Sequence, residues 1–179
     1  NAAAAVSPIN LLAVVLLATP RQTLPEQDLI RQIDLYLSLL RGFPYSDRIT
    51  LTDLSASAIL DYGESMKVIS REKHALGNLV RMRDESAALA TYFRNNVLHL
   101  FAMPSLMACA FGSNATLRTE DIQRLAWRIC PYIASELFLR WNESELPGVV
   151  DSVLACMASH GLIEPTADNT VWRRPPPSN

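Results

Sequence analysis

Apolar residues recur at every third or fourth position along most of the chain, which predicts a mainly α-helical protein. The first such segment opens with Ser7 and Pro8, an N-cap and first-turn pair, and is expected to end near Thr19, where Pro20 stops it. Its apolar run over 9–18 is about half of the roughly 20 residues that are needed to cross a bilayer. We therefore expect a buried core helix here.

Two more helices and a β-hairpin are expected before residue 84. A second helix is predicted over 25–42, where leucine and isoleucine repeat at helical spacing. Thr52 or Asp53 can cap a third helix that ends near Gly63. The period then changes to two short runs with β-branched residues within 66–82, which is typical of a hairpin.

A long central helix is predicted after this hairpin. Asp84 is expected to cap it, and Pro104 is expected to break or bend it. The uncharged interval between Arg94 and Arg118 is long enough to cross a membrane, but it contains asparagines, a histidine, a proline and a Gly-Ser-Asn sequence. We interpret it as a buried helical hairpin, with an interfacial membrane contact as the less favoured alternative.

The final segment of the chain repeats the order of the first, without a residue-level repeat. Three helices are expected, over 119–127, 131–138 and 142–161. Asn142 and Glu145 have the spacing of a capping box, and Gly161 is a favourable helix end. A second hairpin is expected over 162–172, with a turn around Asp168 and Asn169.

These elements predict a mainly α fold of two winged-helix-like units, each made of helices and a short β-hairpin, joined by a long central helix. The first unit covers residues 1–83, the central helix and helical hairpin cover 84–115, and the second unit with its proline-rich end covers 116–179. The chain begins without an initiator methionine and ends in a proline run, so we expect a piece of a longer polypeptide.

The overall charge does not favour a nucleic-acid partner, although a winged helix raises that possibility. The chain carries 16 Lys and Arg residues against 18 Asp and Glu residues, a formal net charge of -2. The densest basic positions lie around the first hairpin and alternate with acids, namely Arg71, Lys73, Arg81 and Arg83 beside Glu72, Asp84 and Glu85. We expect a solvated hairpin there; a stand-alone winged-helix module for protein interaction or nucleic-acid regulation is the alternative.

The sequence lacks a complete catalytic motif. None of the three histidines is followed five positions later by aspartate, so the His-x4-Asp arrangement of glycerolipid acyltransferases, which supplies a general base, is missing. A nucleophile elbow, a phosphate loop and a dinucleotide-binding motif are missing too. The three cysteines are widely spaced, which suits reduced thiols better than a disulfide or a zinc site. We expect no catalytic or substrate-binding residue, no metal and no cofactor in this segment.

A polar cluster inside an apolar stretch is the most unusual feature of the sequence. Its members are Tyr92, Arg94, Asn95, Asn96 and His99. No carboxylate lies three or four positions from Arg94, so we expect its partner elsewhere in the fold or outside it. The favoured interpretation is a buried polar network that fixes this helix. The alternative is contact with an anionic group, such as a phosphate or a carboxylate of another domain.

Several stretches resemble a known family. They are Ser7-Pro8-Ile9-Asn10-Leu11 with Leu17-Ala18-Thr19-Pro20-Arg21, the run from Tyr92 to Leu106, Glu136-Leu137-Phe138-Leu139-Arg140-Trp141, and Gly161-Leu162-Ile163. Over essentially its whole length the chain resembles the C-terminal region of the bacterial membrane-bound glycerol-3-phosphate 1-O-acyltransferase family (PlsB type). The run from Tyr92 to Leu106 is the most specific part of this resemblance.

The resemblance implies a parent enzyme that moves an acyl group from acyl carrier protein or acyl-coenzyme A to the 1-position of glycerol 3-phosphate, giving lysophosphatidate for phospholipid biosynthesis. It also implies that the parent works at the cytoplasmic face of the bacterial inner membrane. The family's catalytic His-x4-Asp lies upstream of the matched region, so the resemblance implies no catalytic residue here. We expect an accessory helical segment that is inactive alone and packs on the upstream acyltransferase domain.

Overall fold

The structure of the chain is a computed structural model that describes residues 3–75, 77–166 and 170–176. It is mainly helical, as predicted: the described residues form seven α-helices and eight short strands. Contacts divide them into two compact units. The N-terminal unit comprises the described residues of Ala2–Leu40 and Tyr45–Leu98, and the C-terminal unit those of Arg41–Pro44 and His99–Asn179.

The N-terminal unit combines helices with two small sheets. In chain order its elements are β1 (Ala3–Val6), α1 (Pro8–Leu16), the 3-10 turn η1 (Pro20–Gln22), β2 (Thr23–Pro25), α2 (Glu26–Gly42, up to Leu40), β3 (Arg48–Leu51), α3 (Ala56–Ser65), β4 (Ile69–Glu72), β5 (Leu79–Met82), the 3-10 turn η2 (Asp84–Ser86) and α4 (Ala87–Asn95). Strands β1 and β3 pair in parallel, while β2, β5 and β4 form an antiparallel sheet in that order. The predicted first hairpin is therefore confirmed as β4–β5.

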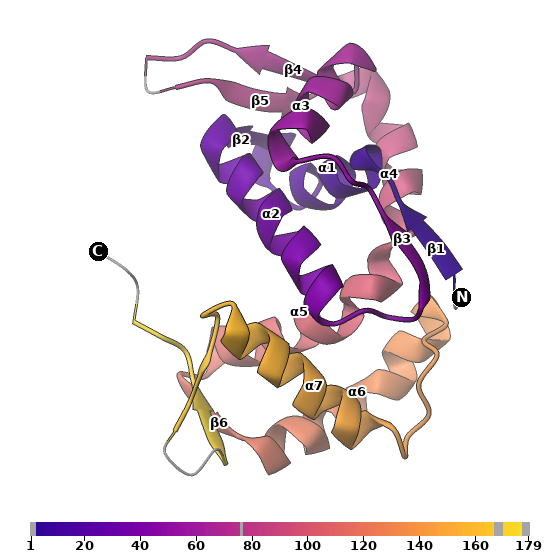
Figure 1. Ribbon diagram of the computed structural model, residues 1–179, viewed down its shortest axis with the longest axis vertical. Coiled ribbons are helices and arrows are strands. Elements are labelled where there is room, and N and C mark those ends of the chain that lie inside the picture. Colours follow the sequence, from indigo (N-terminus) through magenta and orange to yellow (C-terminus); the bar gives the residue numbers. More distant parts are fainter. Residues whose placement is uncertain (1–2, 76, 167–169, 177–179) are drawn as a thin grey trace. The chain divides into compact units, whose positions relative to one another are not determined.

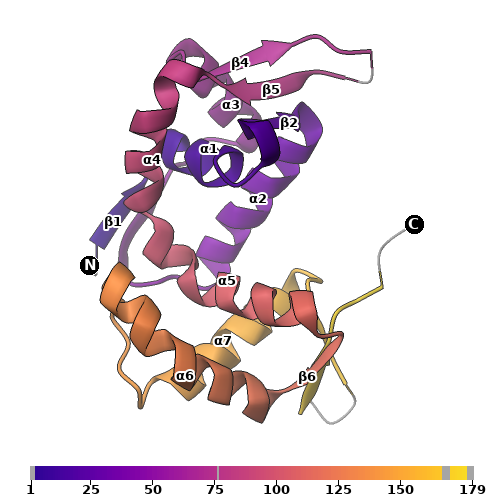
Figure 2. The same cartoon turned by 180° about the vertical axis from the view of Figure 1, so that it is seen from behind.

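Helix α1 is the core of the N-terminal unit. All eight residues from Ile9 to Leu16 are buried, as expected for a helix that is apolar around its whole circumference. Figures 1 and 2 show it surrounded by α2, α3 and α4. Gly63 allows α3 to approach closely, because a Cβ at this position would lie 2.4 Å from Leu12 Cδ1. The prediction of a buried core helix rather than a membrane span is confirmed.

The C-terminal unit packs three helices against one sheet. Its elements are α5 (Leu98–Ser113, from His99), β6 (Thr116–Arg118), α6 (Thr119–Leu137), α7 (Leu146–Ser159), β7 (Glu164–Pro165) and β8 (Val171–Arg173). Helices α6 and α7 lie side by side (Figure 2). Their core includes residues from all three helices, among them Met103, Phe111, Ile122, Val150 and Leu154. The predicted turn around Asp168 and Asn169 falls outside the described residues.

The two units repeat one order of elements. Apart from β3, which lies between α2 and α3, the order α1-β2-α2-α3-β4-β5 of the N-terminal unit matches the order α5-β6-α6-α7-β7-β8 of the C-terminal unit. In both sheets the early strand pairs with the second hairpin strand, giving the orders β2-β5-β4 and β6-β8-β7. The winged-helix interpretation of this order, and the domain boundaries predicted from the sequence, stay predictions.

The prediction of a long central helix followed by a helical hairpin is wrong in two respects. The central helix is two helices, and the break between them lies before Pro104. A single helix, α5, occupies the interval of the predicted hairpin. Helix α4 ends at Asn95, α5 begins at Leu98, and Pro104 lies inside α5. A continuing helix would use the Phe93 carbonyl as acceptor for residue 97. Asn10 Nδ2 takes this carbonyl instead, at 2.7 Å, and the residue-97 amide donates to Arg94 O.

Two other helix boundaries differ from the prediction. Helix α6 runs unbroken through Pro131, where a new helix was expected. Ile122, Ala126 and Cys130 lie on its buried face, and their packing stabilises one continuous helix despite the missing amide hydrogen. Helix α3 is capped by Ser55, whose Oγ accepts from the Ala58 amide, rather than by a residue at 52 or 53.

Among the described helices, none taken singly has both the length and the apolar character of a membrane span. The segment Asp84–Asn95 and helix α5 meet those two criteria only when they are counted together, across the bent break between them.

Candidate functional site

The predicted polar cluster is divided between the two units. Tyr92, at 62% exposure, packs edge-on against Phe93, with ring centroids 6.0 Å apart. Arg94 donates from Nε and Nη2 to Asn95 Oδ1, at 3.2 and 3.0 Å. Sequence reasoning overlooked this partner because adjacent residues do not normally face each other on a helix. Asn96 is exposed and ends α4.

His99 belongs to the C-terminal unit, whereas the other four members belong to the N-terminal unit. Its side chain is buried at the start of α5, and this burial lowers the pKa of the imidazole. A neutral ring is therefore favoured. A role for the cluster as an interdomain contact stays a prediction.

Asn10 is a buried polar residue whose role the sequence analysis missed. Its Oδ1 accepts from both the amide and the hydroxyl of Ser7, at 2.7 and 2.6 Å, and completes a capping box at the start of α1. Its Nδ2 donates to Phe93 O on α4. Two of the stretches that resemble the family thus meet at one hydrogen bond. The spacing of Ser7 and Asn10 was the available signal for the cap.

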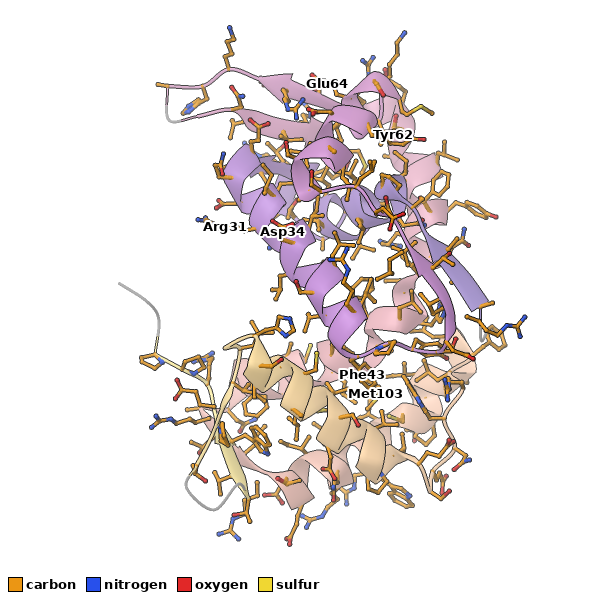
Figure 3. All side chains as sticks on the ribbon, viewed as in Figure 1. Arg31, Asp34, Phe43, Tyr62, Glu64 and Met103 are labelled. Atoms are coloured by element: carbon orange, nitrogen blue, oxygen red, sulfur yellow. The ribbon has the colours of Figure 1, made fainter. Side chains whose placement is uncertain are left out.

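Arg71 on β4 ties the first hairpin to two helices. Its guanidinium donates to Glu26 Oε1 at 2.8 Å, to Asp61 Oδ1 at 2.7 Å and to Glu64 (Figure 3), while Asn78 Nδ2 donates to Glu26 Oε2. Burial alone would lower the pKa of Arg71, but the hydrogen bonds to Asp61 and Glu64 outweigh it and raise the pKa. This arginine is paired within the fold, so the expectation of a purely solvated hairpin surface is wrong at Arg71.

The other charged residues of the hairpin line two open polar depressions in the N-terminal unit. Arg81 pairs with Asp84 at 3.0 Å and Arg83 with Glu85 at 2.6 Å. Arg21, on the opposite rim, has a left-handed backbone with φ of 56°. The depressions are lined by charges of both signs, and two of the arginines are paired with neighbouring carboxylates.

One thiol and one imidazole lie close together in the C-terminal unit without forming a catalytic pair. Cys156 Sγ is 3.9 Å from His160 Nδ1, but the same Nδ1 is 2.8 Å from the Cys156 carbonyl oxygen. A carbonyl can only accept, so Nδ1 carries the hydrogen and cannot take a proton from the thiol. Burial raises the pKa of Cys156, which further disfavours the thiolate. All three cysteines are thiols, as predicted.

An apolar pocket of about 260 Å³ lies between the second half of α6 and the segment that leads to α7. Its apolar lining consists of Cys130, Pro131, Ala134, Leu139, Trp141 and Leu146, and its polar lining of Asn142 and Glu143. Burial raises the pKa of Cys130, and its thiol lies 3.6 Å from Met103 Sδ. The reciprocal hydrogen bonds predicted for Asn142 and Glu145 are present at this rim: Glu145 N donates to Asn142 Oδ1 and Asn142 N to Glu145 Oε2. They close the turn before α7, which begins at Leu146 rather than at Asn142 as predicted.

Large aromatic side chains are exposed on α6 next to this pocket. Trp127 is 55% exposed, and Phe138, which ends the helix, is 69% exposed. Pro131 and Ala134 lie between them and line the pocket, so we call these four residues the apolar stripe. Tyr132 is 74% exposed but lies about 140° around the helix from Trp127. Sequence periodicity did not reveal this surface, because an apolar residue at helical spacing is more often buried.

The chemistry of these sites is that of binding and packing. Within the described ranges, no group of three His, Cys, Asp or Glu side chains lies together as metal ligands would. Cys156 and His160 do not form an activated nucleophile. What the arrangement offers is an anchored hairpin in one unit and an apolar surface in the other.

The family described as glycerol-3-phosphate acyltransferase C-terminal region matches residues 1–178. The chain belongs to this family. It is 45% identical over 179 residues to the glycerol-3-phosphate acyltransferase of Pseudomonas paraeruginosa, and 44% identical over 179 residues to that of Pseudomonas fluorescens. Each alignment covers 100% of this chain and 21% of the relative. The chain therefore spans about a fifth of the length of these acyltransferases, and the resemblance inferred from the sequence is confirmed.

Proposed function

We propose that this chain is the accessory C-terminal portion of a glycerol-3-phosphate 1-O-acyltransferase, and that it stabilises the catalytic domain of the same polypeptide. The parent enzyme would join the acyl group of acyl carrier protein or acyl-coenzyme A to glycerol 3-phosphate, giving lysophosphatidate. The main support is the match over residues 1–178 to the C-terminal region of that family, combined with coverage of only 21% of the relatives.

The chemistry of the reaction supports the same assignment. The 1-hydroxyl oxygen must attack a thioester carbonyl, its proton must pass to a general base, and the thiolate must leave. The three histidines of this chain lack the His-x4-Asp arrangement that supplies such a base in glycerolipid acyltransferases. Catalysis is therefore assigned to the part of the polypeptide outside these residues. Action at the cytoplasmic face of the inner membrane belongs to the same proposal.

The nucleic-acid alternative receives no support from the described hairpin. Arg71, Arg81 and Arg83 are each paired with carboxylates, so they do not form a free basic stripe for phosphates.

An acyl-transfer assay tests the proposal. We expect the whole protein to acylate glycerol 3-phosphate, the 179-residue chain alone to be inactive, and a version lacking these residues to lose most activity or to unfold at lower temperature. Full activity and unchanged thermal stability of the shortened version would refute an accessory role. Activity of the isolated chain would place the catalytic groups within it.

A further inference from the structure

The C-terminal unit exposes an apolar surface that nothing in its own fold uses. We propose that the apolar stripe and its neighbouring pocket dock onto the remaining part of the acyltransferase polypeptide, with one large apolar side chain of that part filling the pocket. This inference rests on the proposed function, because it names the surface through which the accessory portion would act.

The apolar stripe is continuous along one side of α6. Trp127, Pro131 and Ala134 occupy positions i, i+4 and i+7, which lie within about 60° of one another around a helix. Phe138 follows at the helix end, where its left-handed backbone leaves the helical series. Exposed aromatic residues grouped on one helix side are typical of an interaction surface, whereas single exposed apolar residues need no explanation. Aromatic side chains also dominate the energetics of known interfaces.

The conformation of Phe138 supports a role outside the unit. Its backbone is left-handed, with φ of 53° and ψ of 50°, a region that is unfavourable for a bulky residue and is usually occupied by glycine at a helix end. Its ring is also 69% exposed. Both features oppose the stability of the chain alone. A partner that covers the ring would offset them, which is the pattern expected at a functional surface.

The pocket is of a size that one large side chain of a partner can fill. Its volume of about 260 Å³ lies below the roughly 300–1,000 Å³ of most ligand sites. An aromatic or large aliphatic side chain inserted from a partner suits such a pocket. Glu143 is exposed at the rim, so we expect a lysine or arginine next to the inserted side chain.

The length of the relatives identifies the partner. The matched relatives are nearly five times as long as this chain, since the alignment covers 21% of each. Most of their polypeptide therefore lies outside these residues and is covalently linked to them at high effective concentration. An anionic lipid surface fits less well, because the pocket is concave and carries the Glu143 carboxylate at its rim.

Site-specific photo-crosslinking in the whole protein tests the docking surface. A benzophenone amino acid replaces Phe138 in one variant and Tyr132 in the control, which is equally exposed but lies on another side of α6. We expect position 138 to crosslink within the same polypeptide to a peptide outside residues 1–179, at least tenfold more than position 132. Mass spectrometry of the digested product identifies the peptide.

Several outcomes would overturn the inference. Three concern the crosslinked partner of position 138: a second copy of the protein, lipid, or only residues 1–179. Two concern the yield: equal crosslinking from positions 138 and 132, or no crosslink at all. Failure of the proposed function gives a different result, because it appears as full activity after deletion of residues 1–179. The activity of the deletion version therefore tests the proposed function, and the crosslink from position 138 separately tests the docking surface.

Discussion

The surface depressions of the two units differ in chemistry, although the units share one order of elements. In the N-terminal unit the depressions are polar and include paired charges, as in Arg81 with Asp84. In the C-terminal unit the pocket is apolar and is bordered by the exposed rings of Trp127 and Phe138. A charged surface whose ions are paired is stable in water, whereas an apolar surface gains free energy when a partner covers it. The comparison therefore assigns internal support to the first unit and docking to the second.

The largest loss of stability is expected when the ion-pair network around Arg71 in the N-terminal unit is broken. Replacing Arg71 by Leu leaves three carboxylates facing one another without their common cation, so we expect a loss of about 2 kcal/mol in the free energy of unfolding. The matched control is Arg124→Leu, which removes an exposed i,i+3 pair and should cost less than about 0.5 kcal/mol. Denaturant unfolding of the chain measures both. Equal effects would show that the Arg71 network is no more than a set of surface ion pairs.

The next effect concerns the buried amide that joins α1 to α4. We expect Asn10→Ala to destabilise the chain by about 1–2 kcal/mol, because the Phe93 carbonyl loses its donor and the Ser7 capping box is broken. Asn142→Ala removes an exposed capping box and should cost about half as much. Hydrogen exchange at the α4–α5 break provides a second readout. Unchanged protection there in the Asn10 variant would contradict the role assigned to this bond.

The break after Asn95 and the continuity of α6 through Pro131 show the limits of prediction from the sequence. Helix α2 and the first hairpin were predicted because their signals, apolar spacing and short β-branched runs, are local. The break after Asn95 was missed because its cause, the amide of Asn10, lies 83 residues away from Phe93 in the chain. The continuity of α6 through Pro131 was missed for a similar reason, since packing by the rest of the unit outweighs the local preference.

The candidate site was less predictable than the fold. The polar cluster around Arg94 stands out in the sequence because charge is rare there, yet the resolved partner of Arg94 is its exposed neighbour Asn95. The apolar stripe does not stand out, because periodicity cannot separate an exposed apolar position from a core one. The left-handed Phe138 is also invisible in a sequence, where glycine or asparagine would be the usual signal.

A smaller effect concerns the pH dependence of the C-terminal unit. Burial lowers the folded-state pKa of His99 below its ordinary value of 6.5, so the unfolded chain binds the proton more readily. Stability should therefore fall as pH decreases below about 6.5, toward the lower folded-state pKa. His99→Gln should flatten this part of the profile, because it removes the buried ring that titrates. Identical stability profiles of the unmodified chain and the His99→Gln variant between pH 5 and 7, about the range in which histidine titrates, would contradict the role assigned to His99.

The smallest expected change is a gain in stability rather than a loss, and it sharpens the comparison between the two units. Phe138→Gly removes the left-handed strain, so we expect the 179-residue chain to become more stable by about 0.5–1 kcal/mol. Thermal unfolding of the chain measures this gain. A loss of stability would mean that the Phe138 ring contributes to packing within the chain, and its assignment to an external partner would fail.

The most direct test is the rate at which the whole protein loses acyl-transfer activity on warming. If the apolar stripe holds the catalytic part, Trp127→Ser combined with Phe138→Gly should speed inactivation about tenfold, equivalent to about 1.4 kcal/mol of lost docking. Tyr132→Ser should behave like the unmodified protein. Equal inactivation rates for the stripe variant, the Tyr132 variant and the unmodified protein would contradict the account.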